Sequence, residues 1–306
     1  MKLDRLNSTP VKLLQKPVTA LLFAIGMILI LQVSKVERWD ALLWATLFFL
    51  CLDAHKDQGD DSWLRFLPMG ILMLAGPFYI YKHAADWWWQ IAEWQMNSVH
   101  HYFNWDQAFA RIPLNDPGAL ARIFPSAWLT EKLKWVYNYG FGFAIWGAVI
   151  RSFAARDWRK MLHYLLATHL LQTPLIIPFY NTIELHEVWW VLGRADAFIR
   201  PTFMDAYHLK LNAQNCMPSM HTSIAFAVLL LALREKGPIF KYGMAAYCGA
   251  IIFSTLYLNI HWTLDVVAGL AFGYGVVKLS DWIMVKVRKW TGTRPVEPAQ
   301  PLSTAL

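Results

Sequence analysis

The chain has 306 residues, of which 57% are hydrophobic and only 16% are charged, and its mean hydropathy is positive at +0.31. This composition excludes an ordinary soluble domain and predicts a polytopic membrane protein. The net charge of +7 does not indicate nucleic-acid binding, because Lys and Arg fall in short clusters between apolar runs and form no basic face interleaved with aromatic residues.

Apolar segments recur along the chain and predict an all-α bundle of about seven or eight transmembrane helices. The runs lie at 18–36, 66–81, 133–153, 161–177, 219–233, 239–260 and 262–285, with a shorter eighth candidate at 41–52. The first run follows several basic residues, as a signal peptide would. No small-residue cleavage site follows it, so we expect a retained span. No alternating strand pattern is present.

Basic residues between these runs predict the orientation of the chain. If the N-terminus is cytoplasmic and all eight runs cross, the inner connections are 53–65, 154–160, 234–238 and the tail after 285. They hold His55, Lys56, Arg65, Arg156, Arg159, Lys160, Arg234, Lys236, Lys286, Arg288, Lys289 and Arg294. The positive-inside rule thus places both termini in the cytoplasm, and we expect a bacterial inner-membrane protein.

Two long connections fall on the outer side, at 82–132 and 178–218. The first contains DWWWQIAEW (86–94), whose indole rings suit a helix at headgroup level or, with equal weight, simple packing. We divide the chain into a cytoplasmic segment (1–17), N-terminal helices with the long outer loop (18–129), a catalytic membrane domain (130–285) and a basic, disordered cytoplasmic tail (286–306).

Two stretches place polar side chains at the edges of apolar runs: NCMPSMHTSIAFAV (215–228) and LYLNIHWTLDVVAG (256–269). An ionised group at the centre of a membrane helix costs about 2.5–3.5 kcal/mol, so such groups tend to be functional. The apolar run 219–233 crosses inward from His221, and the run 239–260 crosses back and ends next to His261. We therefore expect both histidines at the outer surface.

Asp265 follows His261 by four residues, one helical turn, so the two side chains can meet on one face of a helix. A carboxylate on one imidazole nitrogen fixes the tautomer and leaves the other nitrogen to attack. His221 could then protonate the leaving oxygen as general acid. This chemistry needs no metal or other cofactor, and the sequence has no dense Asp/Glu set that would hold magnesium.

An anion could bind beside these groups. PSMH (218–221) opens a helix whose first N–H groups would face an anion, and Ser219 adds a hydroxyl donor. Upstream, GRADAFIRPTF (193–203) supplies Arg194 and Arg200, whose guanidinium groups can each grip two phosphate oxygens. Lys210 is a weaker candidate.

These residues resemble the motifs of the type 2 phosphatidic acid phosphatase superfamily. Its PSxH motif is matched by Pro218, Ser219 and His221, and its SRxxxxxHxxxD motif by Ser254, His261 and Asp265. The resemblance covers roughly 130–285. It implies a six-helix core in which His261 is the nucleophile, His221 the acid and base, Asp265 the orienting carboxylate and Ser219 a phosphate ligand.

Two positions depart from the family pattern. Thr255 stands where the third motif has Arg, and the KxxxxxxRP motif survives only as RADAFIRP (194–201), with Arg194 for Lys and one residue fewer before Arg200. The resemblance implies phosphate binding by both arginines. In lacking this cation, the chain is similar to the inositol phosphorylceramide synthase and sphingomyelin synthase branch of the superfamily. The substrates of that branch are phosphodiesters, which carry one negative charge fewer than a phosphate monoester.

The resemblance implies a lipid phosphatase or phosphotransferase that cleaves a lipid phosphate or phospholipid headgroup ester through a phosphohistidine and passes it to water or a lipid alcohol. A haloperoxidase is disfavoured, since it would be expected in a soluble chain with a fuller cationic cradle. The alternative from another class is a non-enzymatic lipid or proton-coupled transporter. It would need polar residues midway along several spans, whereas here they gather at boundaries.

Overall fold

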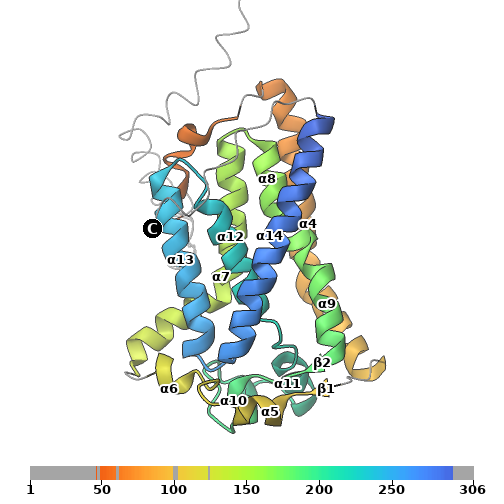
Figure 1. The fold of residues 1–306 in the computed structure, drawn as a ribbon, viewed down its shortest axis with the longest axis vertical. Helices are drawn as coiled ribbons and strands as arrows, with labels where there is room; N and C mark the ends of the chain where they lie inside the picture. The colour runs from red at the N-terminus through yellow and green to blue at the C-terminus, as the bar shows by residue number, and fades with distance from the viewer. Residues whose placement is uncertain (1–45, 47–48, 60–61, 99–102, 123–124, 292–306) are drawn as a thin grey trace, which may run out of the picture.

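The computed structural model describes residues 46, 49–59, 62–98, 103–122 and 125–291, which form an upright bundle of helices (Figure 1). The all-α class is confirmed for this part of the chain. The expected segment 1–17, the run 18–36, most of the run 41–52 and nearly all of the tail after 290 lie outside the described residues.

Long helices build the bundle. They are α4 (Trp63–Ser98), α7 (Ala127–Ala154), α8 (Trp158–Leu165), the π-helical turn η3 (Leu166–Leu170), α9 (Gln172–Thr182), α12 (Met220–Ala232), α13 (Pro238–Tyr257) and α14 (Thr263–Trp290). The apolar runs 133–153, 219–233, 239–260 and 262–285 correspond to α7, α12, α13 and α14, whereas the run 161–177 spans α8, η3 and α9.

Side-chain caps set where several helices begin. Ser126, Asp157 and Ser219 precede α7, α8 and α12, and each accepts an N–H from the first turn that the helix itself leaves unpaired. Pro238 opens α13 directly after Gly237, because proline fits the first helical position, where no N–H is needed. The reversal between α12 and α13 is therefore encoded locally.

Helix α12 lies at the centre and packs against α7, α13 and α14. Its side chains are apolar around most of the helix and supply much of the main hydrophobic core. Glycines let α14 approach it closely: a Cβ on Gly269 would lie 2.7 Å from the carbonyl oxygen of Ser219, and one on Gly273 would lie 2.6 Å from that of Ser223. The absence of side chains at these positions sets the spacing of α12 and α14.

Short elements gather at one end of the bundle, at the bottom of Figure 1. They are α5 (Asp106–Arg111), α6 (Gly118–Ala121), α10 (Val188–Val191), α11 (Ala206–Ala213) and the strands β1 (Phe103–Asn104) and β2 (Ile183–Glu184). The 3₁₀ turn η4 (Arg200–Thr202) belongs to the same segment of the chain. The strands pair in parallel, Phe103 with Ile183, and are too short to show a sequence period.

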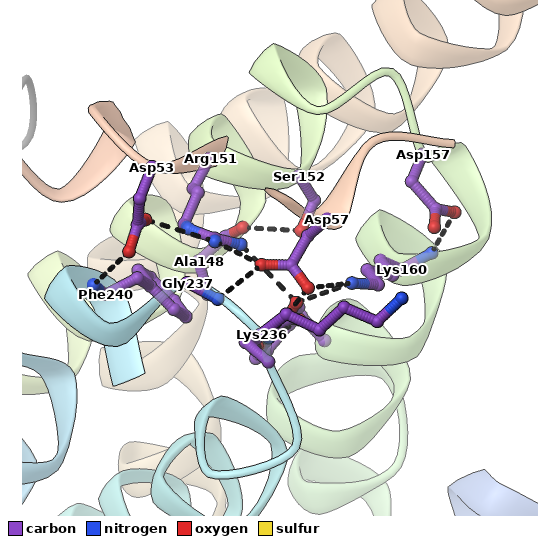
Figure 2. A network of polar contacts seen from close by, with 12 residues as sticks. Asp53, Asp57, Ala148, Arg151, Ser152, Asp157, Lys160, Lys236, Gly237 and Phe240 are labelled. Carbon is purple, nitrogen blue, oxygen red and sulfur yellow. Dashed lines mark hydrogen bonds and ion pairs between the residues drawn. The ribbon is translucent and has the colours of Figure 1, made fainter. Parts of the chain in front are cut away.

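A buried ionic network closes the opposite end of the bundle (Figure 2). Arg151 of α7 bonds Asp57 at 2.5 Å, Asp53 at 3.2 Å and Glu235 at 3.4 Å. Lys160 of α8 reaches Glu235 at 2.5 Å and Asp57 at 3.3 Å. The network ties the segment before α4 and the α12–α13 turn to α7 and α8.

Helix α4 differs from its prediction. The expected span ended at 81, but the helix continues to Ser98, because no Gly or Pro interrupts residues 78–98. DWWWQIAEW is therefore the second half of α4 and not a separate helix in an outer loop. Trp87 and Trp94 are exposed on it, with 42% and 51% of their surface accessible.

Among the described residues, α13 and α14 are long and apolar enough to cross a membrane by length and composition. Shorter apolar stretches occur at Leu64–Pro77, Gly142–Ala154 and Met220–Ala232. A count of seven or eight spans stays a prediction.

Candidate active site

His261 lies in the turn between α13 and α14, and Asp265 lies in the first turn of α14. The helix begins at Thr263, so the two residues do not meet as successive turns of one helix, as their spacing suggested. Instead the carboxylate turns back: its Oδ2 accepts the N–H of Trp262 at 3.0 Å and lies 3.3 Å from Nδ1 of His261. One buried carboxylate therefore caps the helix and orients the imidazole through Nδ1, so that Nε2 is the ring nitrogen turned away from Asp265.

His221 lies in the first turn of α12, and its ring faces the same site. The ring centroids of His221 and His261 are 6.3 Å apart, a separation compatible with a phosphoryl group between them. Tyr137 of α7 stacks on His221, with centroids 4.2 Å apart and planes 19° from parallel. The structure thus brings together one histidine from α12 and one from the α13–α14 turn, and the first is fixed by stacking.

Ser219 is fully buried and caps α12. Its hydroxyl accepts the N–H of Thr222 at 3.3 Å and donates to the Thr222 hydroxyl at 3.0 Å, while its own N–H donates to the carbonyl of Asp265 at 3.1 Å. The residue therefore connects the start of α12 to the start of α14. Phosphate binding by Ser219 stays a prediction.

Arg200 is buried, and every N–H of its guanidinium is engaged. Nε and Nη2 donate to Asp196 at 2.9 and 3.0 Å, Nη1 donates to Glu187 at 3.0 Å and to Asn212 at 2.5 Å, and Nη2 also donates to Glu187. Burial would lower the pKa of Arg200, but the charges of Glu187 and Asp196 hold it above its usual value.

Arg194 lies in the same loop and reaches toward the turn that carries His261. Its Nη1 donates to Asp116 at 2.8 Å and to Asn259 at 3.2 Å, and Nη2 also donates to Asp116. These hydrogen bonds hold the pKa of the Asp116 carboxyl below its ordinary value. Both arginines of RADAFIRP are therefore paired with carboxylates, and phosphate binding by either one stays a prediction.

Thr255 supports the site through its backbone only. Its carbonyl accepts the N–H of Ile260 at 3.2 Å and of His261 at 3.1 Å, and its hydroxyl donates to the carbonyl of Ile252 at 2.7 Å. It shapes the turn before His261 but brings no positive charge. Lys210, the weaker candidate, lies 3.6 Å from Glu184 and is 42% exposed.

Comparison with known proteins adds to this geometry. Residues 186–289 match the PAP2 superfamily. This segment of the chain is therefore similar to the PAP2 superfamily. It is also 29% identical over 175 residues to an uncharacterized protein of Methanocaldococcus jannaschii, a match that covers 52% of this chain and 64% of that protein. No solved structure matches the chain.

The PAP2 segment contains every site residue discussed so far that came from the sequence motifs, from Arg194 to Asp265. It begins at His186, beside Glu187, and ends within α14. Assignment to the synthase branch of the superfamily stays a prediction.

Cys216 also lies in this site. Ligand atoms of Cys216, His261 and Asp265 all lie within 4.8 Å of one another, and this donor set could hold a metal ion such as zinc. Burial raises the pKa of the Cys216 thiol well above its usual value, and the charges of Asp265 and Glu187 raise it further. A metal there would need the thiolate, which this environment disfavours, and would occupy the His261 imidazole.

Three further residues of the site escaped the motif reading: Tyr137, Glu187 and Asp116. They come from α7, from the segment before α10 and from the loop before α6, far from the PSxH and HxxxD motifs. In the sequence, Glu187 is a carboxylate next to His186 and belongs to no motif. No sequence signal linked it to Arg200, because that contact joins two turns of an irregular segment.

Proposed function

We propose that the protein is an integral-membrane lipid phosphoesterase that acts through a phosphohistidine on His261. The observation that carries this proposal is the pairing of His261 Nδ1 with buried Asp265 at 3.3 Å, with the His221 ring 6.3 Å away. The match of residues 186–289 to the PAP2 superfamily supports a phosphatase-type reaction. The lipid nature of the substrate is supported by the two helices long and apolar enough to cross a membrane.

The reaction has two in-line steps. Nε2 of His261 attacks phosphorus, the N–P bond forms, and the P–O bond to the leaving group breaks as His221 gives that oxygen a proton. An acceptor hydroxyl then attacks phosphorus, His221 takes its proton, and the N–P bond breaks. Asp265 stabilises the imidazolium character of His261 in both steps. Water as acceptor gives hydrolysis, and a lipid alcohol gives transfer of the phosphoryl or phospho-headgroup.

Labelled lipids test this reaction directly. The purified full chain is given phosphatidate or a phospholipid, with and without diacylglycerol or ceramide, and the products are identified by mass spectrometry. We expect free phosphate or a new phospholipid from the wild type, and an acid-labile phosphohistidine trapped on His261. His261→Ala should lose turnover by at least about 10⁴-fold while lipid binding is retained.

His208→Ala is the matched control, because His208 is half exposed and bonds Asp205 rather than the site. Equal activity of the wild type and His261→Ala would overturn the proposal. Movement of lipid between liposomes without any product would favour the transporter instead.

We further propose that the site faces the outside of a bacterial inner membrane and that the ionic network faces the cytoplasm. The distribution of basic residues supports this orientation. In a chain with its three cysteines replaced by serine, Phe203→Cys at the site end and Lys236→Cys at the network end both expose the new thiol. A membrane-impermeant maleimide should label Phe203→Cys in intact cells and Lys236→Cys only after lysis. The reverse pattern would refute the orientation.

A further inference from the structure

The guanidinium of Arg200 has no donor left for a substrate. Arginine has five N–H donors, and here two go to Asp196, two to Glu187 and one to Asn212. Glu187 takes the fork formed by Nη1 and Nη2, which is the bidentate geometry by which arginine grips two phosphate oxygens. A carboxylate of the protein therefore sits in the position of a bound anion.

Glu187 is held firmly in this position. Its carboxylate also accepts the indole N–H of Trp189, its backbone N–H donates to the carbonyl of Ala213 at 2.9 Å, and the residue is 5% exposed. Trp189 in turn stacks beneath the Arg200 guanidinium at 5.1 Å. A displaced Glu187 would leave a charge with little access to water, so exchange with a substrate phosphate is unfavourable.

The pair lies next to the reacting groups. The backbone N–H groups of Val188 and Trp189 donate to the carbonyls of Ile260 at 3.3 Å and Asn259 at 3.0 Å, directly before His261. On the other side, Arg200 lies 5.8 Å over the ring of Phe198. That ring is 5.4 Å from the ring of Tyr137, which stacks on His221.

The two motif arginines and their carboxylate partners together carry a net negative charge. Two cations, Arg194 and Arg200, face three carboxylates, Asp116, Glu187 and Asp196, which leaves a net charge of −1 before Asp265 is considered. A phosphate monoester is mostly a dianion at neutral pH, because its second pKa is about 6, whereas a diester is a monoanion. Each additional negative charge on the substrate is repelled by this net negative charge.

We propose that Glu187 is a specificity-determining residue that holds the fork of Arg200 and thereby selects phosphodiesters over phosphate monoesters. This inference rests on the proposed phosphoesterase function and narrows its substrate class to phospholipids with a headgroup ester. The Glu187 carboxylate forms no covalent bond with the substrate. It reduces the positive charge that the site presents to the substrate phosphate.

The test compares two substrates with the same acyl chains, phosphatidate as monoester and phosphatidylglycerol as diester, with the full chain in mixed micelles. The wild type should have the larger kcat/KM for the diester. Glu187→Gln should raise the monoester-to-diester ratio of kcat/KM by about tenfold or more, because one negative charge leaves the fork.

Asp196→Asn is the matched control, since it removes an equal charge from the side edge of the same guanidinium. We expect it to shift the ratio less than about threefold, because the fork stays closed by Glu187. Equal shifts in the two variants, an unchanged ratio in Glu187→Gln, or a wild type that prefers the monoester would each overturn the proposal. Turnover that survives His261→Ala, or none in the wild type, would instead refute the proposed function.

A measurement on the wild type alone tests the proposal even if the Glu187→Gln variant does not fold. Methyl phosphate and dimethyl phosphate, a dianion and a monoanion at pH 8, are compared as competitive inhibitors. Dimethyl phosphate should bind at least as tightly as methyl phosphate. Tighter binding of methyl phosphate by tenfold or more would show that the fork opens readily for a dianion and would overturn the proposal.

Discussion

Asp265 performs two tasks with one oxygen. Its Oδ2 accepts the N–H of Trp262, which ends the turn before α14, and the same oxygen faces Nδ1 of His261. The other oxygen, Oδ1, is buried and makes no hydrogen bond within the part of the chain that the structure describes. The carboxylate is thus fixed by the helix start, and the position of the imidazole follows from it.

Asp265→Asn separates these tasks. Asparagine keeps an oxygen to accept the Trp262 N–H but loses the charge that supports an imidazolium, so we expect kcat to fall by about 10³–10⁴-fold with little loss of helix content. Steady-state kinetics and circular dichroism measure the two effects. Asp281→Asn, near the far end of α14 where it pairs with Arg234, is the control and should turn over normally. Full activity of Asp265→Asn would contradict the orienting role.

At the scale of elements, the contact of α12 with α14 brings the site together. Ser219 and His221 stand at the start of α12, and Asp265 stands at the start of α14. Gly269, one turn after Asp265, lets the two backbones touch. Any side chain there would push the helices apart and would move His221 away from its partners.

Gly269→Ala should therefore lower both stability and activity. The new Cβ would lie 2.7 Å from the carbonyl oxygen of Ser219, so the backbones must shift, at a cost of about 1–3 kcal/mol. A displacement of this kind should reduce kcat by about 10–100-fold. Gly275→Ala is the matched control in the same helix, because nothing lies within 4 Å of its Cβ. It should be neutral or stabilise by about 0.5–1 kcal/mol, and equal effects of the two changes would refute the close-approach explanation.

At the scale of the whole molecule, the two ends of the bundle carry different groups of polar side chains. One end carries the candidate site, and the other carries the network of Figure 2, in which Arg151 is 1% exposed. Burial would raise the pKa of Asp57, but hydrogen bonds from Arg151 and the backbone hold it well below its ordinary value. The network therefore depends on the charge of Arg151, because a buried carboxylate without a partner is strongly destabilising.

Arg151→Met leaves three carboxylates short of their shared cation. We expect a loss of about 3–5 kcal/mol, seen as a fall of roughly 10 °C in the midpoint of thermal unfolding in detergent. Arg151→Lys keeps the charge without the fork and should lose less. At low temperature the folded Arg151→Met protein should keep its kcat, since the network lies away from the site. A selective loss of kcat without a change in stability would contradict this separation.

The sequence by itself predicted the helical class, the long helices α7, α12, α13 and α14, the run over α8 and α9, and the candidate residues of the site. Apolar runs, capping residues and the PSxH and HxxxD spacings are local patterns, so they are readable without the fold. The extent of α4 was missed, because hydropathy falls after 81 although nothing in the chain stops the helix.

Only the tertiary structure decided the surroundings of those groups. Stacking of Tyr137 on His221, closure of the Arg200 fork by Glu187 and placement of Cys216 beside His261 all join segments distant in sequence or in irregular turns. Such contacts follow from the close packing of α12 against α7 and α14 and from side-chain hydrogen bonds within loops, which have no period. The motif arginines were expected to be open to phosphate. Their partners are carboxylates that the fold brings near, and for Arg200 the reason is that a buried cation requires a counter-charge.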